Sequence, residues 1–202
     1  LAGWNRDEGN YREFFGKDEP SRENYKQKMR ELFGDSTVEE LAMFPGETDE
    51  QMKASAGLLS TADFIAFGTW QWIEMHGKTA GAVIYRYEFD QAPPQVGNVA
   101  GNDEAPAYHS AEIEYVFGTL DSKKLPWRAE DYKLSEQIGT YWTNFAKTGN
   151  PNGSGVTDWP LYEEQSGYRV MHLAGNLRAI PDDHRKQFEF LDTAGATKSK
   201  HD

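Results

Sequence analysis

Residues 82–89, AVIYRYEF, carry the clearest strand pattern in the sequence. Every second residue from Val83 to Phe89 is bulky and apolar, and the opposite face is apolar for part of its length as well. A strand covered on both faces at its start belongs to a sheet with helices on its two sides. A loop rich in Pro, Gly and Asn follows at 90–106, so the strand is expected to end at a sheet edge.

The loop leads into residues 107–118, AYHSAEIEYVFG, which we expect to form a short helix or turn. Its histidine, His109, is in a usual position for a general base held at the rim of a sheet. Spacing alone leaves a structural role for His109 open. Glu112 and Glu114 are expected to be helix or salt-bridge residues. The other four histidines have ordinary explanations at a helix end, in a strand or in solvent: His76, His172, His184 and His201.

Most of the remaining chain has helical periodicity. Ser21 and Thr48 are expected N-caps, and Gly34 and Gly77 are expected helix ends. The predicted helices are about 21–33, 37–43, 48–58, 61–76, 129–147 and 181–192, with a short one after a loop within 1–19. A second strand is predicted at 168–173, and residues 193–202 are predicted to be a disordered tail. Two strands make a poor sheet, so both need neighbours.

Composition excludes several classes of function. The formal net charge is −12 and the sequence pI is about 4.9, which argues against nucleic acid and anionic membrane surfaces as partners. The sequence has no Cys, which excludes disulfides, Cys-type zinc sites and thiol catalysis within the chain. No run of about 18 apolar residues is present to span a bilayer.

Common site motifs are absent too. There is no H-E-x-x-H and no pair of histidines at helical spacing, so no metal site is expected, and no glycine-rich phosphate loop is found. We therefore expect no cofactor. The nucleophile elbow of serine hydrolases, G-x-S-x-G, is missing as well.

Four segments together resemble one known family, the type B carboxylesterases and cholinesterases. GWNRDEG (3–9) is similar to the acid-bearing motif G-x-N-x-D-E-G, and AYHSAEIEYVFG is similar to the histidine segment of that family. AVIYRYEFD (82–90) resembles the strand before the histidine, and YWTNFAKTGNPNG (141–153) with the later WPLY resembles the C-terminal helix and loop. The order matches from about residue 3 to about 192, closest to bacterial carboxylesterases.

This resemblance implies an α/β-hydrolase fold, helix-rich with a few strands, and a serine esterase that works through an acyl-enzyme. Glu8 corresponds to the acid of the triad and His109 to its base. Tyr11 corresponds to a stretch that lines the active-site gorge of cholinesterases, which makes it a candidate substrate contact.

The resemblance further implies that residues 1–202 are the C-terminal segment of a single catalytic domain. An N-terminal segment of the same enzyme would then supply the serine and the oxyanion hole, and this chain alone would be inactive. A secreted or periplasmic location is favoured. Two alternatives stay open: a non-catalytic relative that binds or adheres, and a self-sufficient helical domain.

Overall fold

The structure, a computed structural model, describes three stretches of the chain: residues 1–34, 42–95 and 106–198. The chain divides into two compact units. The sheet unit comprises Leu1–Arg6 and Ile73–Asp182, and the helical unit comprises Asp7–Trp72 and Asp183–Asp202. The interpretation of the chain as a segment of one catalytic domain stays a prediction.

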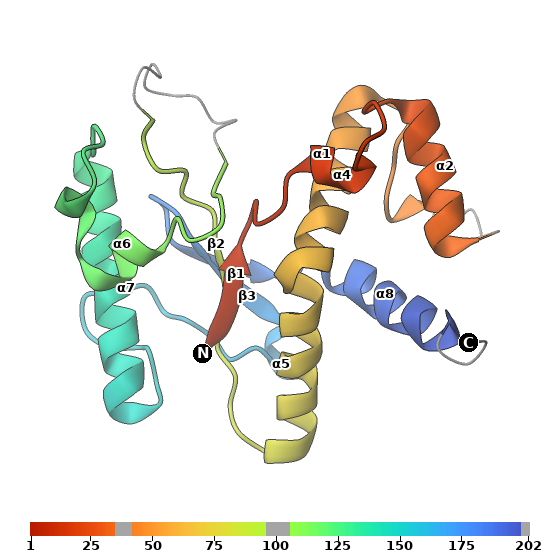
Figure 1. Cartoon of the computed structure of the whole chain (residues 1–202). Coiled ribbons are helices and arrows are strands. Elements are labelled where there is room, and N and C mark those ends of the chain that lie inside the picture. Colours follow the sequence, from red (N-terminus) through yellow and green to blue (C-terminus); the bar gives the residue numbers. More distant parts are fainter. Residues whose placement is uncertain (35–41, 96–105, 199–202) are drawn as a thin grey trace. The chain divides into compact units, whose positions relative to one another are not determined.

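The sheet unit is built on a four-stranded sheet in the order β1-β2-β3-β4 (Figure 1). Its strands are β1 (Ala2–Asn5), β2 (Arg86–Phe89), β3 (Arg169–Leu173) and β4 (Arg178–Pro181). The first three strands run parallel, and β4 is antiparallel to β3. Both predicted strands are therefore confirmed, with β2 shorter than expected. Strands β1 and β4 supply two of the neighbouring strands that β2 and β3 were expected to require.

The two faces of this sheet differ in chemistry. On one face, Phe89, Met171 and Leu173 are buried against residues of α6 (Ile113–Phe117) and α7 (Ala129–Thr148). On the other face, the parallel register places Glu88 opposite His172, and both are buried. Helices α6 and α7 run side by side (Figure 1). Two short 3₁₀ helices, Leu120–Ser122 and Glu164–Ser166, lie in the connections.

A buried carboxylate, Asp131, joins α7 to α6 and to the loop after β2. Its oxygens accept hydrogen bonds from the Arg128 side chain and backbone, the Tyr115 hydroxyl at 2.7 Å and the Gln91 amide at 3.2 Å. Burial alone would raise the pKa of Asp131, but these hydrogen bonds outweigh burial and hold the pKa below its ordinary value. The network therefore needs Asp131 ionised.

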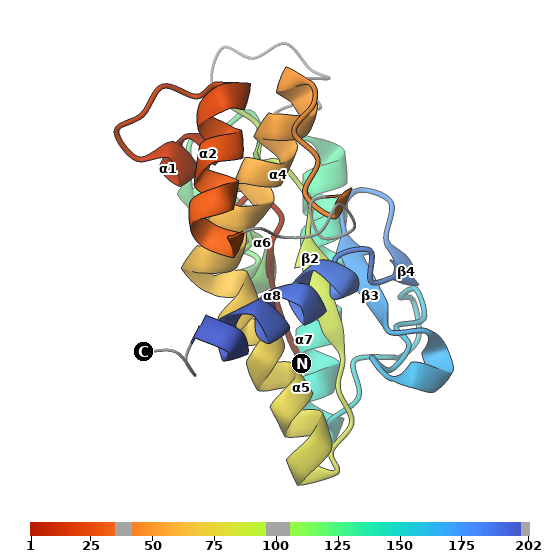
Figure 2. The ribbon, with the colours of Figure 1, turned by 90° about the vertical axis from the view of Figure 1, so that its right-hand side faces the viewer.

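The described residues of the helical unit form several helical elements and the first part of α5 (Figure 2). They are α1 (Tyr11–Phe15), α2 (Arg22–Phe33), α4 (Asp49–Thr61), the π-helical η1 (Ala62–Ala66), α5 (Phe67–Ala80, of which Phe67–Trp72 belongs here) and α8 (Arg185–Lys198). Its core includes Phe15, Tyr25, Met29 and Phe44, with Phe190 of α8 packed against them.

Several helix limits are confirmed. Ser21 caps α2 by accepting from the Asn24 N–H, and Thr48 forms a capping box with Gln51. Gly34 ends α2 and Gly149 ends α7, each at a positive φ.

Other helix limits were predicted wrongly. The helix expected at 61–76 continues from α4 and runs to Ala80, because Gly81 (φ +60°), not Gly77, adopts the left-handed conformation that stops it. Pro181 ends β4 instead of starting the last helix, which begins at Arg185.

The last helix also extends to Lys198, so residues 193–198 are helical and not a disordered tail. Ala194 favours this extension, and the Thr193 hydroxyl donates back to the Glu189 carbonyl. The remaining tail, 199–202, and most of the helix predicted at 37–43 lie outside the described residues.

Replacing Asp131 with Asn should lower the free energy of unfolding by about 2–3 kcal/mol at pH 7, because an amide cannot accept all the hydrogen bonds that the carboxylate accepts. A group whose folded pKa is depressed stabilises the fold above its unfolded pKa. Its contribution is lost as pH falls through the folded pKa. In urea denaturation, the difference in the free energy of unfolding between wild type and variant should therefore be complete at neutral pH. It should become smaller only below about pH 4.

The neighbouring acid Glu130 is the matched control. It pairs with the same arginine at 2.9 Å, but its side chain is 56% exposed. Glu130→Gln should cost less than about 1 kcal/mol. If the two variants lost the same free energy of unfolding, Asp131 would contribute no more than an ordinary surface charge.

Candidate functional site

The turn that carries His109 is held from the end of β1. The Asn5 side-chain amide donates to the Tyr108 carbonyl at 2.8 Å and to the Glu112 carboxylate at 2.5 Å. The Ala111 N–H closes the turn on the same Tyr108 carbonyl at 3.0 Å. His109, between these anchors, is exposed. A solvent-facing imidazole on a fixed turn suits a group that must transfer protons.

Backbone strain marks the same turn. Ser110, directly after His109, has φ +70°, a conformation uncommon outside glycine. Such strain persists only where surrounding contacts impose it, and it concentrates at functional sites. The Asn5 contacts on either side of His109 supply that constraint.

Glu112 and Glu114 have the structural roles expected of them. Glu112 accepts from Asn5, as above. Glu114 forms a salt bridge with Lys123 at 2.8 Å, and this hydrogen bond raises the pKa of the Lys123 ammonium. Both glutamates therefore support the turn and α6.

Glu8 lies in the helical unit and is half-buried. The next residue, Gly9, explains the local shape. Its N–H donates to the Thr61 hydroxyl at 3.1 Å, and a Cβ on Gly9 would lie 2.5 Å from the backbone carbon of Ser60. Only glycine allows the segment after Glu8 to lie this close to the end of α4.

Tyr11 stands at the first position of α1 and is half-buried at the margin of the helical core. The guanidinium of Arg12 and the ammonium of Lys53 lie 5.3 and 5.8 Å from its ring centre. The ring therefore already has cationic neighbours within reach of a cation–π interaction. A contact between Tyr11 and substrate remains a prediction.

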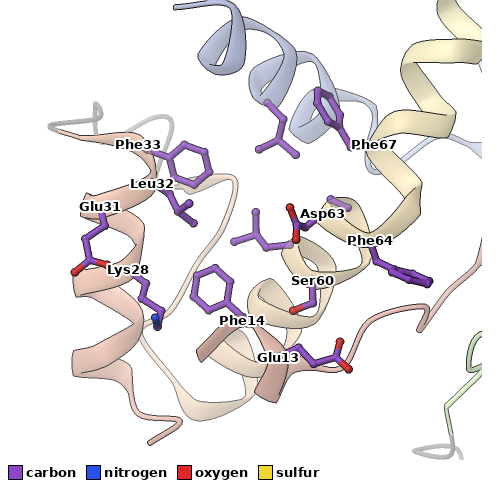
Figure 3. Close-up of a pocket in the computed structure, with 13 residues that line it drawn as sticks. Glu13, Phe14, Lys28, Glu31, Leu32, Phe33, Ser60, Asp63, Phe64 and Phe67 are labelled. Atoms are coloured by element: carbon purple, nitrogen blue, oxygen red, sulfur yellow. The ribbon is translucent and has the colours of Figure 1, made fainter. Parts of the chain in front are cut away.

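A pocket of about 560 Å³ opens in the helical unit (Figure 3). Phe14, Leu32, Phe33 and Phe67 give it apolar walls, and Ser60 contributes a hydroxyl. Charged groups stand among the lining residues, and one of these, Lys28, is paired with Asp18 at 3.1 Å. The volume and lining suit a hydrocarbon chain better than a charged ligand.

The sequence predicts no metal site, yet one group of possible ligands was missed. Glu88, Asp90 and His172 place one ligand atom each within 4.8 Å of one another in the sheet unit. Two acids at i and i+2, Glu88 within β2 and Asp90 directly after its end, were the available signal, since residues two apart in an extended segment share a face. Their partner lies more than eighty residues away in sequence, and no local spacing connects it. His172 is packed, as expected.

The fold defines the class of protein. A mostly parallel sheet with flanking helices is the arrangement of α/β folds, the α/β-hydrolases among them. The structure resembles that of a PNB esterase with a TM-score of 0.60 at 24% identity, covering 93% of this chain and 36% of that one. This likeness shows the α/β-hydrolase fold, as the sequence predicts.

The chain belongs to the carboxylesterase family, whose profile matches residues 4–190. A medium-chain fatty acyl-CoA hydrolase precursor from Anas platyrhynchos is 35% identical over 149 residues, covering 71% of this chain and 26% of that protein. The cocaine esterase of Homo sapiens is 32% identical, covering 56% of this chain and 20% of its own length. The chain thus spans about a quarter of the length of such relatives. None of the helices in the described stretches is both long and apolar enough to cross a membrane.

Gly9→Ala should destabilise the helical unit by several kcal/mol, because the new methyl group would meet backbone atoms of Ser60 that cannot move aside cheaply. Gly57→Ala, within α4, is the matched control. Its nearest neighbour would be the Tyr11 Cβ at 3.9 Å, and alanine favours a helix, so stability should stay equal or rise by up to about 1 kcal/mol. Thermal and urea unfolding would test both. A Gly9→Ala protein as stable as wild type contradicts the close approach.

Asn5→Ala should cost about 1–3 kcal/mol, because it removes the donor for the Tyr108 carbonyl and the Glu112 carboxylate. Asn24→Ala serves as comparison, since the Asn24 amide donates to the Glu19 carbonyl at an exposed position and its loss should cost less than about 1 kcal/mol. Amide hydrogen exchange gives a local measurement. Exchange of the Ala111 N–H should become faster in Asn5→Ala and stay unchanged in Asn24→Ala.

Proposed function

We propose that this chain supplies the acid and the general base of a serine carboxylesterase, Glu8 and His109. The nucleophilic serine and the oxyanion hole would come from an N-terminal segment of the same enzyme, since the 202 residues contain no G-x-S-x-G elbow. Membership of the carboxylesterase family supports the ester-hydrolase chemistry.

One observation carries the proposal. β1 and β2 are adjacent parallel strands, so their carboxyl ends share one edge of the sheet. Glu8 follows the end of β1 by three residues, and His109 is in the turn reached by the loop that leaves β2. Ligands and reacting groups in open α/β sheets gather beyond the carboxyl ends of the strands. The order acid, then histidine, is also that of the α/β-hydrolase triad.

The proposed chemistry is acyl transfer in two halves. His109 takes the proton of the serine hydroxyl as the oxygen attacks the ester carbonyl, and it returns that proton to the departing alcohol. A water molecule then repeats the sequence on the acyl-enzyme and releases the acid. Glu8 accepts the other imidazole N–H, which fixes the tautomer of His109 and stabilises the imidazolium.

Hydrolysis of p-nitrophenyl esters tests these roles. In the full enzyme that includes the serine segment, His109→Ala should lower kcat by roughly 10³–10⁶-fold. Glu8→Gln should lower it by about 10⁴-fold, as in a triad whose acid becomes an amide. The isolated 202-residue chain should show no hydrolysis above buffer.

His76→Ala is the matched control, because the family resemblance places no catalytic role on this histidine, and kcat should be unchanged. Two outcomes would overturn the proposal. One is hydrolysis by the isolated chain that survives His109→Ala. The other is a full enzyme whose kcat is insensitive to both His109→Ala and Glu8→Gln, as expected of a non-catalytic binding relative.

A further inference from the structure

Three possible metal ligands meet on the polar face of the sheet. Glu88 of β2 pairs in register with His172 of β3, and Asp90 lies two positions beyond Glu88 on the same face. Their nearest ligand atoms all lie within 4.8 Å of one another. We refer to these three residues as the Glu88–Asp90–His172 cluster.

The cluster is largely shielded from solvent. The side chains of Asp90 and His172 are 11% and 7% exposed, and Glu88 is 5% exposed. Asp90 Oδ2 lies 2.7 Å from His172 Nδ1 and 3.9 Å from the guanidinium of Arg178. Buried carboxylates are costly unless cations or donors compensate them.

Asp90 supplies an independent observation. Its second oxygen, Oδ1, is inaccessible to solvent and accepts no hydrogen bond. A buried carboxylate oxygen without a donor is rare in folded proteins and calls for an explanation such as a bound ion. The contact with His172 explains the position of Oδ2 only.

We propose that the Glu88–Asp90–His172 cluster binds one divalent transition-metal ion of the zinc type. An imidazole nitrogen with two carboxylate oxygens suits Zn²⁺, Co²⁺ or Mn²⁺, whereas Mg²⁺ and Ca²⁺ prefer oxygen ligands throughout. Two carboxylates would balance the ionic charge, with His172 neutral. Three protein ligands leave a fourth tetrahedral position open.

Binding requires two small adjustments. Ligand atoms around tetrahedral zinc are roughly 3.3 Å apart, given bonds of about 2.0 Å, so the Asp90–His172 contact must open by about half an ångström. Arg178, opposite His172 on β4, has its guanidinium 3.9 Å from Asp90 Oδ2. This guanidinium would repel the ion, but its side chain is 49% exposed and can turn into solvent.

Calorimetric titration of the purified, metal-free protein with ZnCl₂ tests the proposal, and the visible spectrum of the CoCl₂ complex reports the coordination. We expect one equivalent of Zn²⁺ to bind, and the affinity to fall at least tenfold in Asp90→Asn, Glu88→Gln and His172→Gln. Arg178→Gln should bind more tightly, because it removes the competing cation. Zn²⁺ affinity should be unchanged in His184→Gln, since His184 is not a member of the cluster and lies 3.7 Å from the exposed acid Asp183.

A measurement on the wild-type protein covers the case in which a variant fails to fold. The imidazole ¹⁵N resonances of His172, assigned through backbone correlations, should shift on addition of one equivalent of ZnCl₂, with those of His184 unmoved. Absence of Zn²⁺ binding, affinity unaffected by Asp90→Asn, or shifts confined to other histidines would each overturn the proposal. The cluster would then be only a buried charge network.

Discussion

The hydrogen bonds to the Asp131 carboxylate hold the part of the sheet unit that carries His109. They reach Gln91, at the start of the loop after β2, and Tyr115, in the helix that follows the histidine turn. One buried anion thus holds both ends of a segment of more than twenty residues.

A second constraint comes from the polar face of the sheet. Arg86 of β2 is fully buried, with its guanidinium stacked between the rings of Trp4 (4.1 Å) and Tyr162 (5.3 Å) and paired with Asp182. Aromatic stacking and a charged partner together offset much of the cost of burying a guanidinium. Arg86 therefore connects β1, β2 and the end of β4 within one unit. A strand that carries Arg86, Glu88 and Phe89 can be buried on both faces only with such partners.

Sequence patterns predicted the caps, helices and strands that depend on interactions within a few residues. The caps at Ser21 and Thr48, the long helix α7 and strand β2 follow from spacing within a few residues, and they are confirmed. Strand β4 could not be predicted, because Pro181 marks a helix start as readily as the end of an edge strand. The roles of Asn5 and Asp131 depend on partners far away in sequence, so only the folded chain shows them. Glu8 and His109 were identified by resemblance, since spacing alone leaves both ordinary.

Register connects the Glu88–Asp90–His172 cluster to the apolar packing on the opposite face of the sheet. A slip of β3 by one residue relative to β2 would turn Met171 and Leu173 away from the α6 and α7 side, at a cost of several kcal/mol for two fully buried side chains. The register that avoids this loss is the one that sets Glu88 opposite His172. The burial of apolar side chains on one face of the sheet therefore offsets the cost of bringing charged groups together on the other face. The turn that carries His109 depends instead on Asn5 and Asp131, so this turn and the Glu88–Asp90–His172 cluster can be disrupted separately.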